Sequence, residues 1–117
     1  MDRMNLMAAL KEKGADIDGI MERFLQDEAF YADCFEEFML DENFEALGKA
    51  IALGYYPQAF ECAHALKGVA GNLGLLPLYR AVNDMVSAIR ASEYDALDRL
   101  YQIVVLEHDF FASLLSL

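Results

Sequence analysis

The chain has 117 residues, a length that fits one domain with a single hydrophobic core. Hydrophobic residues make up 56% of it, which argues against a disordered chain, and no apolar run approaches the roughly 18–20 residues of a membrane span. The formal net charge of −11, from 9 basic and 20 acidic residues, argues against nucleic acid or anionic lipid as a partner. We therefore expect one soluble domain over residues 1–117 whose charge discriminates among protein partners.

The first half of the sequence shows helical periodicity throughout, and strand patterns are missing. A short helix over residues 2–13 is predicted to stop at Gly14, and a second helix to begin at the N-cap Asp16. A third helix is predicted from Asp27, and a fourth follows Asp41 and ends near residue 54. The side chains predicted to face the core here are Met4, Met7, Ala8, Leu10, Ile17, Ile20, Met21, Phe24, Leu25, Phe30, Tyr31, Cys34, Phe35, Phe38, Met39, Phe44, Leu47, Ile51 and Leu53.

In the second half, a central helix is predicted from about Pro57 to Leu73, with Gly74 just past its end. The helix that opens near Pro77 would form an antiparallel hairpin with it, and a last helix would run from about residue 95. Their predicted core residues are Leu78, Val82, Met85, Val86, Ile89, Leu97, Leu100, Tyr101, Val104, Phe111 and Leu115. Four helices of three or more turns, from about residue 27 onward, can close on one another. The sequence thus predicts an all-α fold, an up-and-down antiparallel four-helix bundle capped by short additional N-terminal helices.

The two cysteines, Cys34 and Cys62, are isolated in apolar surroundings without C-x-x-C spacing. The N-terminus shows no signal-peptide pattern. We therefore expect reduced thiols in a cytoplasmic protein.

The central helix carries an unusual outer face. At about 100° per residue, one side holds a stripe of core-facing residues, and His64 points away from it. That stripe is Ala59, Cys62, Leu66, Val69, Ala70 and Leu73. Lys67 and Gly68 stand beside His64, and Gly71 lies one turn further on. Glycine inside a helix costs roughly 0.5–1 kcal/mol relative to alanine, so two of them beside the outward ring call for a reason.

Three interpretations of His64 fit its surroundings poorly. A core histidine conflicts with the stripe on the opposite side, and an idle surface histidine leaves the lysine and glycines unexplained. A metal ligand needs a second His or carboxylate three or four residues away, where Lys67 and Gly68 stand. His108, by contrast, is bracketed by apolar residues at helical spacing and is predicted to be packed and structural.

The run His64-Ala65-Leu66-Lys67-Gly68 and the small residues after it resemble the signature of histidine phosphotransfer (HPt) domains. The segment from residue 24 to Phe38 also resembles the opening helices of that family. The resemblance implies that His64 is phosphorylated and that Lys67 stabilises the phosphoryl group. The residues around His64 also predict a docking surface for partners, because an apolar patch around a polar centre suits transient docking; it is formed by Phe60, Gly68, Gly71, Asn72 and Leu75.

Alternatives without a role in function remain open for these residues. Lys67 could be a solvated lysine, and the glycines could serve helix packing. Phe60 could pack against the N-terminal helices, and Asn72 could only cap the helix end. Family members often carry Ser or Thr in place of Ala65, and a Leu-Glu pair in place of Met85-Val86. These departures leave open which side chain orients His64; the candidates are Asn83, Asp84 and Ser87.

The resemblance implies a phosphorelay intermediate, a phosphocarrier with no ATP site of its own. Its partners would be response regulator receiver domains and a sensor histidine kinase, which can be a hybrid kinase. No cofactor is expected, since Mg²⁺ would belong to the receiver domain, and the chain is expected to be a monomer. Two alternatives stay open: a non-catalytic helical scaffold for two-component signalling proteins, and the histidine-bearing module of a chemotaxis-type kinase.

Overall fold

The computed structural model describes residues 3–116, with the side chains of residues 6–116, and that part of the chain is helical without strands. The elements are α1 (Arg3–Lys13), α2 (Ile17–Arg23), α3 (Glu28–Met39), α4 (Asn43–Leu53), α5 (Tyr56–Asn72), α6 (Leu76–Arg90), η1 (Tyr94–Ala96), α7 (Leu97–Ser113) and η2 (Leu114–Ser116), where η marks a 3-10 turn. The predicted all-α fold is confirmed. Across the same residues, none of the helices combines the length and apolar character that crossing a bilayer requires.

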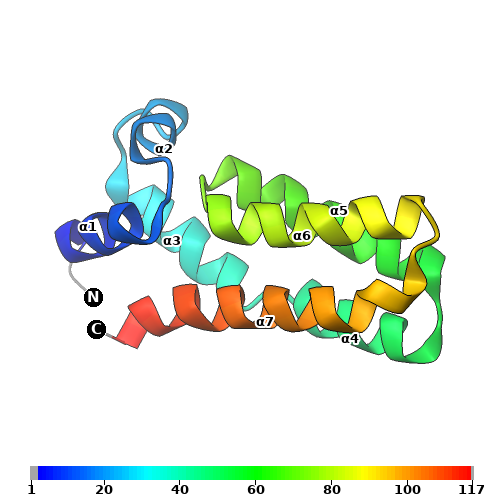
Figure 1. Cartoon of the computed structure of the whole chain (residues 1–117). Coiled ribbons are helices and arrows are strands. Elements are labelled where there is room, and N and C mark those ends of the chain that lie inside the picture. Colours follow the sequence, from blue (N-terminus) through cyan, green and yellow to red (C-terminus); the bar gives the residue numbers. More distant parts are fainter. Residues whose placement is uncertain (1–2, 117) are drawn as a thin grey trace.

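Helices α4 to α7 form the antiparallel bundle (Figure 1). Helix α5 packs against α4 and α6, and α7 packs against α6 and α4, so α5 and α7 occupy opposite corners. Helices α1 and α2 lie at one end of the bundle, and α3 leads from them to the start of α4. The predicted bundle with short N-terminal helices is confirmed. Of the long segments after residue 27, α3 is the one outside the four-helix core, where it contacts α1 and α7.

The helix ends follow from residues with known capping behaviour. The side chains of Asp16 and Asp27 each accept a hydrogen bond from the backbone N–H three residues on, at 3.1 and 3.0 Å, as predicted for N-caps. Helices α4 and α5 are followed by Gly54 and Gly74 with φ of +71° and +69°. Side chains rarely adopt this left-handed conformation, so glycine at these places ends each helix without strain.

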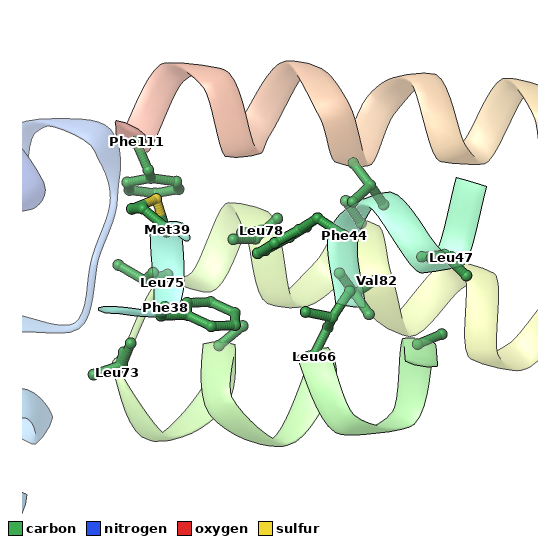
Figure 2. Close-up of a cluster of buried hydrophobic side chains, with 14 of the residues drawn as sticks. Phe38, Met39, Phe44, Leu47, Leu66, Leu73, Leu75, Leu78, Val82 and Phe111 are labelled. Atoms are coloured by element: carbon green, nitrogen blue, oxygen red, sulfur yellow. The ribbon is translucent and has the colours of Figure 1, made fainter. Parts of the chain in front are cut away.

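The core fills the space between the four bundle helices and includes side chains from the end of α3 (Figure 2). All five residues predicted to face inward on α6 are buried, because α6 carries apolar side chains at a regular helical spacing. Other predicted core residues that are buried are Leu10, Ile20, Phe24, Tyr31, Phe35, Phe38, Met39, Phe44, Leu47, Ile51, Leu97, Val104 and Phe111. The predictions for Met7, Ile17, Met21, Cys34, Leu100, Tyr101 and Leu115 are met in part, since these side chains are half-buried against the core.

Outside α5, four predicted core residues are exposed instead. Leu25 is 86% exposed because α2 ends at Arg23 and the chain turns, with a φ of +52° at Leu25 that takes it off the helical face. Phe30 lies in the first turn of α3, with its ring beside Phe24 but 56% exposed, and Leu53 is the last residue of α4. Ala8 faces solvent because α1 packs through its other side. The side chain of Met4 lies outside the described residues.

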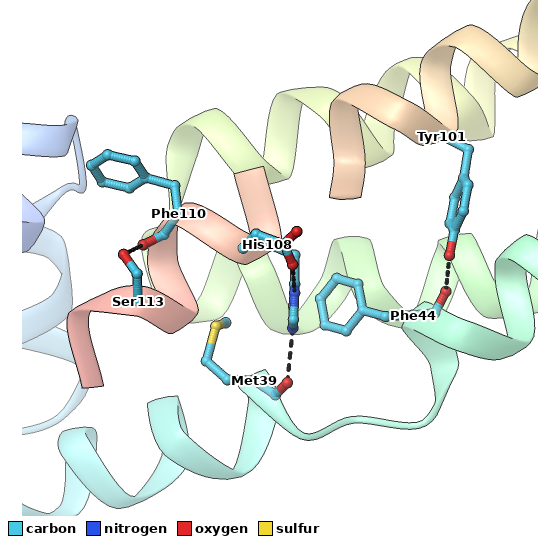
Figure 3. A network of polar contacts seen from close by, with 7 residues as sticks. Met39, Phe44, Tyr101, His108, Phe110 and Ser113 are labelled. Atoms are coloured by element: carbon cyan, nitrogen blue, oxygen red, sulfur yellow. Dashed lines mark hydrogen bonds and ion pairs between the residues drawn. The ribbon is translucent and has the colours of Figure 1, made fainter. Parts of the chain in front are cut away.

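A tyrosine joins α7 to α4 (Figure 3). The hydroxyl of Tyr101 donates a hydrogen bond to the backbone oxygen of Phe44 at 2.8 Å. Its ring lies directly over Gly48, where a methyl group would come within 2.5–2.8 Å of the phenol. Gly48 therefore allows the close approach of α7 to α4.

Candidate functional site

Helix α5 begins with Tyr56 and Pro57 in its first turn, and its buried side is mostly alanine. Ala59, Ala63 and Ala70 are fully buried together with Leu66. Small side chains on this side let the α5 backbone lie close to α4 and α6, which leaves the opposite side of the helix to solvent.

The buried stripe differs slightly from the predicted one. Ala63 belongs to it, whereas Val69 is 38% exposed and Cys62 is only half-buried. At 100° per residue, the observed core direction is rotated by roughly 30–40° from the predicted one, toward Ala63. The rotation follows from contact with two neighbouring helices, which an isolated helical wheel does not include. It leaves His64 on the exposed face.

His64 is exposed on α5 and stacks against the ring of Phe60, one turn earlier. The two ring centroids are 5.7 Å apart and the ring planes differ by 20°. The Phe60 ring also contacts the guanidinium of Arg90, at 5.2 Å from the ring centroid. Phe60 is therefore packed against α6, and not against the N-terminal helices.

The orientation of the imidazole is not fixed by a hydrogen bond from the described part of the chain. The three candidates for that role, Asn83, Asp84 and Ser87, lie on α6, and none of them bonds the His64 ring. Because the ring is exposed and in contact with Phe60 through its face, its nitrogens remain available at the edge.

Lys67 and Gly68 flank His64 as the helical spacing predicts. Lys67 is half-buried, with its ammonium 6.0 Å from the centroid of the Tyr79 ring on α6. A methyl group placed on Gly68 would meet no described atom within 4 Å outside its own stretch of helix backbone. The surface beside His64 is thus open on the Gly68 side and carries a cation on the Lys67 side.

The remaining predicted docking residues differ in their burial. Leu75 is fully buried, so its predicted docking role is wrong: α5 ends at Asn72, and the chain turns Leu75 into the core. Gly71 is not open either, because a methyl group there would lie 3.3 Å from the Tyr79 ring, and this glycine serves helix packing. Asn72 is exposed, as a surface residue requires.

Sequence reasoning missed Arg90 and Tyr79, which touch the site from α6. A signal was available in the predicted hairpin. Arg90 lies about as far after the turn at Gly74 as Phe60 lies before it, so an antiparallel pairing brings the two together.

The C-terminal end of α5 is held by the N-terminal segment. The Tyr31 hydroxyl donates to the backbone oxygen of Leu73 at 2.7 Å, and the Asp16 backbone N–H donates to that of Gly74 at 2.9 Å. The Arg23 Nε donates to the backbone oxygen of Asn72 at 2.9 Å. These bonds satisfy carbonyls that a helix end leaves unpaired, and the Arg23 charge suits the negative end of the helix dipole.

The other histidine has a structural setting, as predicted (Figure 3). His108 is half-buried on α7, and its Nε2 donates to the backbone oxygen of Met39 at 2.8 Å. Its ring lies against Phe44, with the centroids 4.4 Å apart. A ring nitrogen that is committed in this way is a poor nucleophile.

Both cysteines are free thiols. Burial, followed by the carboxylates of Glu37 and Asp33, raises the pKa of the Cys34 thiol. Burial also raises the pKa of Cys62, with Glu61 the next cause. A raised pKa lowers the thiolate fraction at neutral pH, so neither cysteine is an activated nucleophile. Across residues 3–116 no cluster of three or more His, Cys, Asp or Glu side chains is arranged to hold a metal ion.

Comparison with known proteins identifies the family. A family model described as Hpt domain matches residues 32–111, which is more than two thirds of the chain and includes all of α4, α5 and α6. Comparisons with curated proteins and with solved structures gave no match. The chain therefore belongs to the Hpt domain family, the histidine phosphotransfer modules that work with receiver domains and histidine kinases in two-component signalling.

Proposed function

We propose that His64 is the phosphorylated residue of a phosphorelay intermediate. It accepts a phosphoryl group from the aspartate of a receiver domain, or from a cognate histidine kinase, and passes it to a response regulator. The observation that carries the proposal is the setting of His64 on α5: an exposed imidazole whose nitrogens make no hydrogen bond to the described residues, next to the open surface at Gly68. Within the described residues, His108 is the other imidazole; its Nε2 donates to the backbone oxygen of Met39, and its Nδ1 lies 3.2 Å from the Asp109 carboxylate.

The part of His64 in the reaction is to act as the nucleophile through its neutral imidazole. The lone pair of the unprotonated ring nitrogen attacks phosphorus, and a P–N bond forms. The P–O bond to the donor aspartate breaks, and the aspartate leaves as a carboxylate with the bonding electron pair. The proton on the other ring nitrogen of His64 is then free to pass to solvent. Transfer to the next receiver reverses these bond changes on a new aspartate.

Lys67 is the charge that would stabilise the phosphoryl oxygens. It lies three residues after His64 on the same side of α5, and its stem is half-buried against α6. Partial burial limits the volume that the ammonium explores on the side of α5 that carries His64. An ammonium is a compact point charge that suits a group whose oxygens move during transfer.

The partner surface extends from Gly68 and Asn72 toward α3. An apolar groove of about 610 Å³ opens there between α3 and α5, and its lining includes Phe30, Val69 and Asn72. The side chains of Phe30 and Val69 are exposed at this groove, although both were predicted to be buried. An apolar surface beside a polar centre suits transient docking of a receiver domain. This groove takes the place of Leu75 in the predicted docking surface.

The test is a transfer assay with radiolabelled receiver domains charged by acetyl phosphate. The wild-type protein should acquire label that is stable to base and labile to acid, as expected of phosphohistidine. His64→Gln should acquire none, while its circular dichroism spectrum stays helical. The matched control is His108→Gln, which should still be labelled even if its stability falls.

Label that persists in His64→Gln would refute the assignment of His64. A wild-type protein that binds charged receiver domains but takes up no label would instead support the scaffold alternative.

A further inference from the structure

The ring of His64 is oriented by a contact between its face and the ring of Phe60. An exposed side chain ordinarily samples several rotamers, and fixing one of them before reaction lowers the entropic barrier. The Phe60 ring, 5.7 Å away and tilted by 20°, is in the offset-stacked geometry that aromatic pairs prefer. This contact restricts the rotation of the imidazole, although the described residues supply no hydrogen bond to it.

Stacking has a chemical advantage over a hydrogen bond at this site. Both imidazole nitrogens lie in the ring plane, with their lone pair or proton pointing outward from the edge. A hydrogen bond to either nitrogen would occupy one edge position, whereas a contact through the face leaves both free. The ring can therefore be held in place while one nitrogen attacks phosphorus and the other keeps its proton.

Phe60 is itself held by the neighbouring helix. Its side chain is half-buried, and the Arg90 guanidinium in the last turn of α6 lies 5.2 Å from the ring centroid. Cation–π contact at this distance favours one orientation of the phenyl ring. The position of His64 on α5 is thus linked to α6 through Phe60, although α6 contributes no hydrogen bond to the imidazole.

We infer that Phe60 is a positioning residue for His64, held in turn by Arg90, and that its ring face presents the imidazole with both nitrogens free. This replaces the predicted role of Phe60 as a docking residue. It rests on the proposed function for its effect on transfer, but the orientation of the ring can be measured without any transfer.

The first experiment measures the orientation by NMR in the full chain. In Phe60→Leu the carbon-bound ring protons of His64 should shift downfield, since the ring current of Phe60 is lost. The side-chain couplings of His64 should also change toward rotamer averaging. Phe60→Tyr keeps the ring and should retain the wild-type values, and Arg90→Gln should give an intermediate change. Unchanged His64 shifts in Phe60→Leu would overturn the inference, whatever His64 does in catalysis.

The second experiment separates positioning from docking. Single-turnover transfer from a charged receiver domain is measured as a function of its concentration. In Phe60→Leu the rate at saturation should fall about 3- to 10-fold, the range expected for one aromatic contact, while Kd for the receiver changes less than twofold. Phe60→Tyr should restore the rate.

A raised Kd with an unchanged saturating rate would show that Phe60 docks the partner, and would overturn its positioning role. A wild-type protein that takes up no label would refute the proposed function, and the inference would then be decided by the NMR result alone.

Discussion

Gly68→Ala is expected to stabilise the protein. The added methyl group would face open space, so the change acts only on the helix backbone. Alanine is favoured over glycine in a helix interior by up to about 1 kcal/mol. At about 2.1 cal/mol/K per residue, the 117 residues have an unfolding entropy near 0.25 kcal/mol/K. The midpoint of thermal unfolding should therefore rise by up to about 4 °C, which circular dichroism can measure.

Gly48→Ala is the matched control, since it makes the same chemical change inside α4. There the methyl group would lie within 2.5–2.8 Å of the Tyr101 phenol, which must move and give up its hydrogen bond to Phe44. Overpacking of this kind costs about 1–3 kcal/mol, so the midpoint should fall by roughly 4–12 °C. Opposite signs for two identical substitutions would show that the effect comes from the surroundings of each glycine.

Gly68→Gln then tests the function of the open space. The protein should still fold, since no described atom lies within 4 Å of the added Cβ outside the helix's own backbone, but the longer side chain would stand between His64 and an approaching receiver domain. Attack requires the reacting atoms at about 3–3.5 Å, so label transfer from the receiver should be blocked. The reasoning is refuted if Gly68→Gln unfolds the protein, or if it transfers at the wild-type rate.

Three further predictions concern single side chains. Lys67→Ala should slow transfer or shorten the phosphohistidine lifetime. The effect should be smaller than the roughly 100-fold loss of rate typical when one electrostatic stabiliser is removed from a site that excludes water. Unchanged transfer and decay rates would show that Lys67 has no part in the reaction. Arg23→Leu removes the donor to the Asn72 carbonyl; it should lower the unfolding free energy by about 0.5–1 kcal/mol and speed amide exchange in the last turn of α5, and unaltered exchange would contradict this. Burial raises the pKa of Tyr31 above its ordinary value of 10, so only the unfolded chain ionises this group as pH rises past 10. The free energy of unfolding should therefore fall there by up to about 1.4 kcal/mol per pH unit. Tyr31→Phe should lessen that slope, and equal slopes in the two proteins would show that Tyr31 is not its cause.

The fold was predictable because its signals are local. Asp16 and Asp27 cap helices through their own nearby backbone, and the glycine after α5 needs only its left-handed conformation. The buried face of α6 could be read from spacing alone, since its polar and apolar positions separate cleanly.

The predictions were wrong where tertiary contacts determine whether a side chain is buried or exposed. Leu75 is predicted to extend the face of α5, but the helix ends before it and the chain turns it inward. Gly71 was placed on the correct side of α5, yet a wheel cannot show that the ring of Tyr79 covers it. Val69 was assigned to the core because its wheel position lies near the boundary, where a small rotation of the helix decides exposure.

The bonds at the end of α5 bear on where the domain begins. The family match starts at residue 32, immediately after Tyr31, and it omits all of the side chains and the N–H that hold residues 72–74. A fragment cut at the limit of family similarity would leave the last carbonyls of the histidine helix to water. The bonds that hold the end of the histidine helix therefore come from residues before the matched segment, and a fragment that begins at residue 32 should be less stable than the whole chain.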